Sequence, residues 1–473
     1  MSTNSSRNEL NLPTRREALF HGLSGLGGVA FLDLFAREQA HANPFAIAPK
    51  VKRVVQIFCP GGVSHVDTFD YKPELARLHG QEMTGKGKVD TFFAQPGKLM
   101  KSPFAFKQHG ACGRWVSSLF PNLAQCVDDL TFIHSMTAKS SNHTPAGFQM
   151  NSGFIMNGYP SMGSWISYGL GTENENLPAF VVFPDPRGLP AGGAINWSNG
   201  FLPATHQGVA FRSSGDPIRD LATPPNVSPA ERQAATQLLD QMNRDDLTAN
   251  PGDSTLSARL RSYELAARMQ LTVPDVINLD GETKATHKLY GLDQPRSEGF
   301  GRNCLLARRL LERGVRFVQL WNGGAFGSPR INWDAHEDIV DNHTTQALTL
   351  DRPAAGLLID LKQRGMLDDT LFLWTTEFGR TPFTQGVGKP GRDHHQHAFT
   401  IFMAGGGLKP GFAYGSSDEV GYKFGENQVS IYDLHATMLH LLGIEHTKLT
   451  YYHNGIRRRL TDVHGEVIEG ILA

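Results

Sequence analysis

The chain has 473 residues, of which 45 are Lys or Arg and 46 are Asp or Glu, so that its formal net charge is only −1. This balance predicts no nucleic-acid partner and no electrostatic attraction to a membrane surface, and an apolar content of 40% excludes a disordered chain. The length suffices for one large domain or two smaller ones. The 50 glycines, 27 prolines and 19 histidines are typical of a loop-rich, enzyme-like protein rather than a helical bundle.

The N-terminal segment has the pattern of an export signal. Residues 14–20, TRREALF, contain a twin-arginine motif, and a weakly apolar stretch then leads to an A-x-A cleavage pattern at residues 40–42. We expect residues 1–42 to be a signal peptide for the twin-arginine export machinery and residues 43–473 to act in the periplasm or outside the cell. An amphipathic helix is the alternative. Asp33 and glycines interrupt the apolar stretch, so no stable membrane span is predicted.

The four cysteines form no C-x-x-C pair. Outside the cytoplasm Cys112 and Cys126 could form a disulfide, which the sequence does not decide. Cys59 ends an apolar run and Cys304 lies on an apolar helical face, so both are interpreted as buried hydrophobic residues.

Short apolar runs bounded by turn residues predict the strands of an α/β protein. The amphipathic helix expected at 303–313 leads directly into one such run, and this order is typical of a parallel sheet. A capping box formed by Ser228 and Glu231 starts one of the helices of a mostly helical insertion at about 203–298. The predicted strands are 51–59, 130–134, 177–183, 315–321, 370–374 and 398–404.

Metal-ligating side chains gather at the ends of these predicted strands. Because open α/β sheets bind ligands in the crevice outside the strand ends, we expect the side chains to converge there. For any one of them a solvated loop is the alternative, and Asp67 could instead cap a helix. The candidate ligands are His65 and Asp67 after the first strand, Asp334 and His336 after the strand at 315–321, Glu377 after the strand at 370–374, and His394, His395 and His397 before the last strand.

Two further residues are candidates for catalysis. Thr144 precedes Pro145 and is interpreted as a helix N-cap, where backbone N–H groups favour an anionic substrate and a neighbouring metal can activate a hydroxyl. An ordinary helix start is the alternative. Arg380 follows Glu377 by three residues and could either hold substrate oxygens bidentately or form a salt bridge. No G-x-S-x-G elbow is present, which disfavours a serine hydrolase.

Several longer motifs resemble one known family. The twin-arginine leader, GGVSHVDTFD, WDAHED, TTEFGRTP and DHHQHAFT look like the exported domain-of-unknown-function 1501 family, which is often grouped with sulfatases within the alkaline phosphatase and sulfatase superfamily. YDLHATMLHLLGI is similar to a helix of that superfamily, and the likeness covers nearly all of residues 51–470. The resemblance implies a three-layer α/β/α sandwich with a mostly parallel central sheet.

The resemblance also implies roles for individual residues. Asp67 matches the first metal ligand, Thr144 the nucleophile, Asp334 and His336 the central Asp and His, and Glu377 the late carboxylate, while one of His394, His395 and His397 matches the last imidazole. Phe378 stands where the superfamily has a second late ligand, a histidine. No cysteine lies in the C-x-P-S-R signature, so the formylglycine mechanism of sulfatases is disfavoured.

These expectations combine into one functional hypothesis. The protein is predicted to be an exported hydrolase of phosphate or sulfate esters that depends on one or two divalent ions (Zn, Mn, Ca or Mg). Its substrate would be an anionic ester, for example a sulfated or phosphorylated glycan. The alternative is a catalytically inactive binding or accessory protein that keeps the superfamily fold.

Overall fold

The computed structural model describes residues 47–85, 89–92, 95–212, 226–249, 254–326, 330–385 and 388–473. The predicted signal peptide, residues 1–42, lies outside this part of the chain. Within the described residues, no helix combines the length and the apolar character that crossing a membrane requires.

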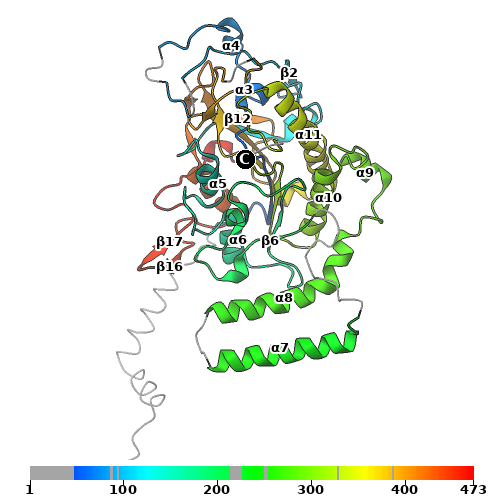
Figure 1. Cartoon of the computed structure of the whole chain (residues 1–473). Coiled ribbons are helices and arrows are strands. Elements are labelled where there is room, and N and C mark those ends of the chain that lie inside the picture. Colours follow the sequence, from blue (N-terminus) through cyan, green and yellow to red (C-terminus); the bar gives the residue numbers. More distant parts are fainter. Residues whose placement is uncertain are drawn as a thin grey trace, which may run out of the picture.

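A nine-stranded sheet, counted over the described residues, forms the centre of the molecule (Figure 1). Neighbouring strands are parallel except β11, which runs antiparallel to both of its neighbours. The inner strands are buried on both faces, which explains why they are continuous apolar runs in the sequence. The order is β12 (Phe412–Tyr414), β4 (Thr131–Thr137), β11 (Phe399–Ala404), β8 (Thr370–Thr375), β1 (Arg53–Phe58), β7 (Phe317–Trp321), β5 (Phe180–Phe183) and β6 (Val209–Ala210), with β15 (Val429–Ser430) also paired to β4.

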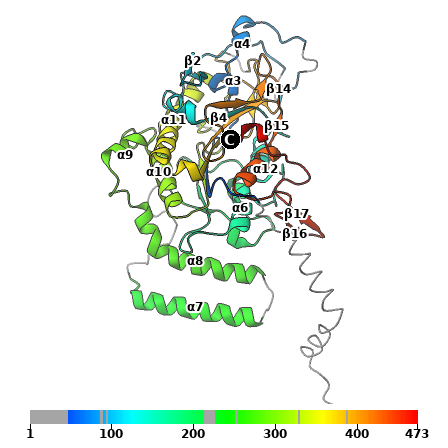
Figure 2. The same cartoon turned by 180° about the vertical axis from the view of Figure 1, so that it is seen from behind.

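Helices cover both faces of this sheet. Val55 and Ile57 of β1 pack in one hydrophobic core with α10 (Glu298–Glu312) and α11 (Ile339–Gln363). Val54 and Phe58 point to the other face and pack in a second core with α6 (Met162–Leu170) and α12 (Ile431–Leu441). The two helix pairs lie on opposite sides of the sheet in both views (Figures 1 and 2). The predicted α/β/α sandwich with a mostly parallel sheet is therefore confirmed.

The strand directions bring distant loops to one edge of the sheet. Because β1, β4, β7 and β8 are parallel, the loops that follow them all leave at the same edge. β11 runs the other way, so the residues that precede it lie at this edge too. Five chain segments thus meet where the candidate ligands are expected.

Two long helices contain an internal proline. α11 begins at Ile339 and passes through Pro353. Its apolar side, from Ala347 to Leu361, is buried in the core, and this packing outweighs the roughly 3 kcal/mol that an internal proline costs. α8 (Ser254–Ile277) likewise continues past Pro274. A 3₁₀ helix, η1 (Leu123–Asp129), precedes β4.

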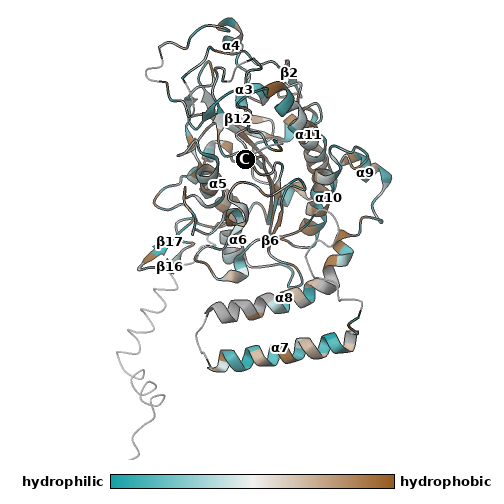
Figure 3. Cartoon of the chain, in the orientation of Figure 1, coloured by the Kyte–Doolittle hydropathy of each residue, from teal (hydrophilic) through white to brown (hydrophobic). Residues whose placement is uncertain are grey.

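The segment at about 203–298 contains mainly helices. They are η3 (Ala204–His206), α7 (Pro229–Ala249), α8 and α9 (Lys284–Leu289), while β6 joins the edge of the sheet. α7 and α8 lie side by side away from the sheet, with α7 outermost (Figures 1 and 3). α7 carries polar and apolar residues mixed along its length (Figure 3).

The four cysteines are unpaired. Cys59 and Cys304 are fully buried, in agreement with their interpretation as hydrophobic residues. Cys112 and Cys126 form no disulfide in this structure.

The turn after β1 depends on Gly61. Its φ is +114°, and a Cβ atom there would lie 2.4 Å from the backbone nitrogen of Asp334 and 2.6 Å from that of Trp333. The Trp333 N–H also donates a 3.0 Å hydrogen bond to the Pro60 carbonyl. The loop after β1 therefore touches the backbone that carries Asp334, and only glycine allows this approach.

We expect Gly61→Ala to destabilise the protein more than Gly80→Ala does. Gly80 also has positive φ, +82°, but a Cβ atom there would meet no other atom within 4 Å, so Gly80→Ala measures the conformational cost alone, about 1–2 kcal/mol. The backbone collision should add ~1–3 kcal/mol at Gly61. Equal losses of unfolding free energy in urea denaturation would contradict the close approach.

Candidate metal centre

Four side chains lie together at the edge of the sheet where the loops after β1, β4, β7 and β8 leave, and they form a group that could hold a metal ion. Among the described residues, ligand atoms of His143, Asp334, His336 and His394 all lie within 4.8 Å of one another. His143 is the first residue of α5 (His143–Ser152), which follows β4. Asp334 and His336 lie between β7 and α11, and His394 lies in the short strand β10 (His394–His395) just before β11.

The carboxylate oxygen Oδ1 of Asp334 is the centre of this group. It lies 2.9 Å from Nε2 of His336, 3.3 Å from Nε2 of His394 and 3.5 Å from Nε2 of His143. The Nε2 atoms of His336 and His394 are themselves 2.9 Å apart. Three imidazoles therefore present the same ring nitrogen to one oxygen.

The opposite ring nitrogen of each imidazole hydrogen-bonds an oxygen acceptor. Nδ1 of His143 is 2.7 Å from Oε1 of Glu377, and Nδ1 of His394 is 2.7 Å from the Ser141 carbonyl oxygen. Nδ1 of His336 is 2.6 Å from Oε1 of Gln385. Because these oxygens accept hydrogen bonds, each Nδ1 carries a proton, and in the neutral form of the ring the lone pair is on Nε2.

This tautomer leaves the three Nε2 lone pairs directed at the Asp334 carboxylate. Lone pairs and an anionic oxygen repel each other at these distances unless a proton or a cation lies between them. Nε2 of His143 is buried and has no hydrogen-bond partner among the described residues. The arrangement fits a divalent cation, since neutral imidazoles with an oxygen acceptor behind Nδ1 are the usual form of metal-bound histidine.

The electrostatics of the group agree with this fit. Burial lowers the pKa of His394 to about 2, so its ring is neutral and able to bind metal. Burial raises the pKa of Asp334, but Arg380 and the three histidines outweigh it and hold that pKa well below the ordinary range. Burial lowers the pKa of His143, whereas Asp334 and Glu377 together raise it above the ordinary value. Metal binding would therefore displace a proton from His143.

Arg380 is fully buried and hydrogen-bonds Asp334 and the loop after β1. Its guanidinium donates to Oδ1 of Asp334 at 2.6 Å, to the Gly62 carbonyl at 2.8 Å and to the Gly61 carbonyl. It also donates to the Arg392 carbonyl at 3.0 Å. Of the two predicted roles, the structure therefore supports the salt bridge and not the grip on substrate.

Glu377 lies behind His143 and outside the ligand group. Oε1 accepts the His143 Nδ1–H and, at 2.8 Å, the Gly61 N–H. The side chain is nearly fully buried. Glu377 was predicted to be a direct ligand, but the structure places its carboxylate against Nδ1 of His143, on the side of the ring opposite to Asp334.

Asp67 is the second departure from the predicted ligand set. Its carboxylate forms a fully buried bidentate ion pair with Arg392, with N–O distances of 2.6 and 3.0 Å, and accepts the Ser64 hydroxyl at 2.6 Å. The guanidinium neutralises the carboxylate, and the pKa of Asp67 lies below its ordinary value although burial raises it. Asp67 is therefore placed in a structural ion pair rather than among the ligands.

Three predicted histidine ligands also lie outside the group. His65 Nε2 contacts the Gly421 carbonyl at 2.8 Å, and His395 Nε2 contacts the Tyr422 carbonyl. His397 lies with Nε2 3.3 Å from Oδ2 of Asp90 and is one-third exposed. Of the three candidates for the last imidazole, the structure therefore brings only His394 into the group.

Sequence reasoning missed His143 and chose its neighbour Thr144. The structure starts α5 at His143 with Asn142 as N-cap, so Thr144 is the second helical residue and not the cap. Thr144 is half-buried and adjacent in sequence to a ligand. His143 follows a predicted strand, as Asp334 and His336 do, and this was the available signal.

Aromatic side chains surround the imidazoles. The Phe326 ring stacks on His143 with centroids 4.1 Å apart, and Phe378 lies 4.9 Å from His143 and 4.8 Å from His394. Phe92 lies 4.9 Å from His394. Phe378 therefore packs against two ligand rings, and the apolar surroundings lower the local dielectric constant.

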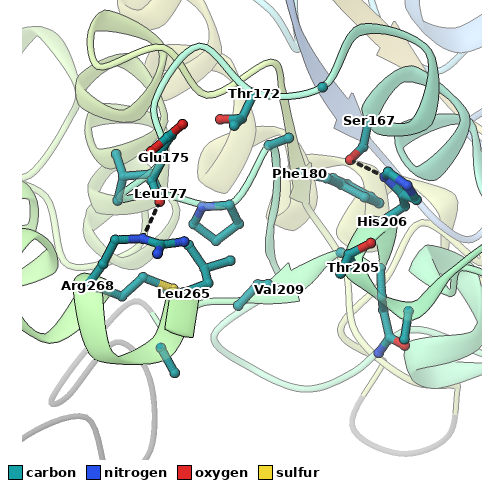
Figure 4. A pocket seen from close by; sticks show the side chains of 18 of the residues that line it. Ser167, Thr172, Glu175, Leu177, Phe180, Thr205, His206, Val209, Leu265 and Arg268 are labelled. Atoms are coloured by element: carbon teal, nitrogen blue, oxygen red, sulfur yellow. Dashed lines mark hydrogen bonds between the residues drawn. The ribbon is translucent and has the colours of Figure 1, made fainter. Parts of the chain in front are cut away.

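A separate cavity of about 870 Å³ lies where β5 begins, at the opposite edge of the sheet, and none of its lining residues belongs to the ligand group (Figure 4). Ser167 Oγ lies 3.0 Å from His206 Nδ1 at one end, and Arg268 donates to the Glu175 carbonyl at the other. Apolar side chains such as Phe180 lie between the two ends. The cavity therefore takes no part in the metal centre.

Comparison with known proteins gives one family match. A family model described as "Protein of unknown function (DUF1501)" matches residues 51–472. Among curated proteins, none matches this sequence.

Solved structures give a distant likeness. One is a protein of the alkaline phosphatase superfamily from Vibrio parahaemolyticus, with TM-score 0.37 and 12% identity over 86% of this chain and 71% of that one. Another is the PsFucS1 sulfatase from Pseudoalteromonas sp., with TM-score 0.33 and 12% identity over 92% and 72%. A third is the lipoteichoic acid synthase LtaP from Listeria monocytogenes, with TM-score 0.34 and 10% identity over 86% and 78%. All three scores lie below 0.5, so the properties of those proteins are not transferred to this chain.

We expect the purified protein to contain about one divalent metal ion per chain, because the part of the chain that the structure describes has one group of four such donors. His336→Ala should weaken binding by more than the roughly 10–100-fold that loss of an outer partner costs. His397→Ala is the matched control, since His397 lies outside the group. Elemental analysis after dialysis distinguishes the two variants, and equal metal content in both would contradict the assignment.

The Asp67–Arg392 pair gives a stability prediction. Asp67→Asn leaves Arg392 buried and unpaired and should lower the free energy of unfolding by about 3–5 kcal/mol, whereas Asp67→Asn with Arg392→Met should recover most of it. Because the pKa of Asp67 is lowered in the folded state, its contribution is present above about pH 3.9 and is lost on acidification below that value.

Urea denaturation between pH 3 and 7 measures this contribution. If Asp67→Asn loses its bound metal while its free energy of unfolding stays unchanged, Asp67 is a metal ligand and not a structural ion-pair partner.

Proposed function

We propose that this protein, which belongs to the DUF1501 family, is an exported metal-dependent hydrolase of phosphate or sulfate esters. The description of that family assigns no activity, so the proposal is based on the metal centre. The observation that carries the proposal is the convergence of His143, His336 and His394 on Asp334, with every Nδ1 hydrogen-bonded from behind. Bringing these polar side chains together in a largely buried place costs free energy, and the group lies at the sheet edge where α/β proteins bind ligands.

The donor set favours particular ions. Three imidazole nitrogens and one carboxylate oxygen suit zinc or manganese better than calcium or magnesium, which prefer oxygen ligands. When bound, such an ion supplies a Lewis acid that polarises the ester and stabilises negative charge on its oxygens.

The protein's own residues contribute positioning and charge. Arg380 holds the Asp334 carboxylate from below and is itself fully buried, so the carboxylate is kept in place. α5 begins at His143, and the positive end of its helix dipole therefore lies at the site, where it favours an anionic substrate. Thr144 lies in the first turn of this helix, and its hydroxyl is the proposed nucleophile that attacks the phosphorus or sulfur atom of the ester.

The proposal extends to location and substrate. The twin-arginine motif supports export to the periplasm or beyond, and an anionic ester, such as a sulfated or phosphorylated glycan, is the proposed substrate class. The absence of the formylglycine signature favours a hydroxyl over a modified cysteine as the nucleophile.

A specific observation favours the second candidate function, a binding or accessory protein without turnover. Four protein donors complete a tetrahedral set, and such closed sites are usually structural, whereas catalytic sites keep a position open. Asp334, His143 and His336 nevertheless retain 11–17% side-chain exposure, which supports access to the site.

Turnover of 4-nitrophenyl phosphate, bis(4-nitrophenyl) phosphate and 4-nitrophenyl sulfate by the zinc- or manganese-loaded protein tests the proposal. We expect hydrolysis of at least one ester, abolished by chelator and by His336→Ala and unchanged in His397→Ala. Thr144→Ala should lower kcat by at least about 10³-fold while the metal is retained, because the attacking group is removed.

Each alternative gives a different pattern. Bound metal without hydrolysis of these esters or of sulfated and phosphorylated glycans supports the accessory function. Hydrolysis that survives in Thr144→Ala assigns the attack to water.

A further inference from the structure

The three acceptors behind the ligand imidazoles differ in charge. His336 and His394 donate to neutral oxygens, the Gln385 amide and the Ser141 carbonyl, at 2.6 and 2.7 Å. His143 donates to the carboxylate of Glu377 at 2.7 Å. Nδ1 of His336 also lies 3.8 Å from Oδ1 of Asp393, a longer contact than the 2.7 Å between His143 and Glu377.

We propose that Glu377 is the positioning residue that sets the metal affinity of the centre by acting through His143. The inference rests on the proposed metal-dependent function but concerns affinity and ligand geometry rather than turnover. It replaces the role of direct ligand with that of an outer partner.

The surroundings of Glu377 hold its carboxylate rigidly. Oε1 also accepts the Gly61 N–H at 2.8 Å, and Oε2 accepts the Thr376 hydroxyl at 3.2 Å. Glu377 follows β8, Gly61 follows β1 and His143 follows β4, so one carboxylate oxygen joins three of the loops that build the site. Any metal-induced movement of His143 would have to break these hydrogen bonds.

The aromatic contacts restrict the same ring. Phe326 stacks on the His143 imidazole at 4.1 Å, and Phe378 lies 4.9 Å away. The hydrogen bond to Glu377 selects the orientation in which Nε2 faces Asp334, and the two phenyl rings keep the imidazole from rotating.

The charge of Glu377 also changes the ring as a donor. A carboxylate that accepts the Nδ1 proton draws it away from the ring and raises the electron density on Nε2, which strengthens a metal bond. An amide or peptide oxygen does this less, because it carries no net charge. His143 should therefore be the strongest of the three imidazole ligands, and its strength should depend on Glu377.

The test is titration of the metal-free full-length mature protein with Co²⁺, followed by the visible absorption bands of the bound ion. Glu377→Gln keeps the size and one acceptor oxygen but removes the charge, and we expect a 10–100-fold weaker affinity with about the same stoichiometry. Glu377→Ala releases the ring, and we expect altered absorption bands as well as weaker binding.

Glu337→Gln is the matched control. Glu337 neighbours the ligand His336 in sequence, and its replacement removes the same charge, but its side chain is 65% exposed and pairs with Arg330 rather than with a ligand ring. The Co²⁺ affinity of this variant should stay within about 2-fold of the wild type. Urea denaturation of each metal-free variant identifies any loss of folding.

The outcomes separate this inference from the proposed function. Wild-type affinity in both folded Glu377 variants, or equal weakening in Glu337→Gln, overturns the role of Glu377 and leaves ester hydrolysis open. Weaker binding in Glu377→Gln alone supports the inference even if no ester is hydrolysed. A wild-type protein that binds neither Co²⁺ nor Zn²⁺ overturns both.

Discussion

The candidate site depends on one carboxylate oxygen. Oδ1 of Asp334 is shared by Arg380 and by the imidazole nitrogens of His143, His336 and His394. Arg380 supplies one compensating positive charge to this largely buried carboxylate, whereas neutral imidazoles whose Nε2 lone pairs face it would supply none. A cation among these atoms removes the conflict, since it attracts the carboxylate and the lone pairs alike.

The fold makes this convergence possible through strand direction and close backbone approach. The parallel strands β1, β4, β7 and β8 deliver their following loops to one edge, and the antiparallel β11 delivers His394 to it from the other direction. Gly61 and Gly391 then let backbones touch: a Cβ atom at Gly391 would lie 2.2 Å from the Ala335 carbonyl oxygen. The ligands Asp334 and His336 flank that contact, so their loop is held between the two glycines.

The strands and part of the site were predictable from the sequence because they follow from local patterns. Buried strands are continuous apolar runs, and polar residues at their ends must lie near one another in a parallel sheet. This argument selected Asp334, His336 and His394, which the structure brings together. His143 also follows a predicted strand, the one at 130–134, but Thr144 was chosen there as a helix N-cap and candidate nucleophile.

The remaining differences concern partners that are distant in sequence. Asp67 pairs with Arg392 across 325 positions, and Glu377 reaches His143 across 234 positions. Whether a carboxylate binds a metal or supports a histidine depends on which side of the ring it occupies, and only the three-dimensional structure shows this.

The distribution of charge argues for one metal ion rather than two. The buried carboxylate of Asp67 is neutralised by Arg392, which is fully buried and bidentate. Glu377 is engaged by His143 and by the Gly61 N–H. A second divalent ion would need anionic ligands, and the carboxylates of Asp67 and Glu377 already have these partners. It would also lie near the two buried guanidinium groups of Arg380 and Arg392. These two residues are neighbours, since Arg380 donates a hydrogen bond to the Arg392 carbonyl. These contacts therefore favour a proposal of one ion at the group of His143, Asp334, His336 and His394, with the arginine charges where a second cation would lie.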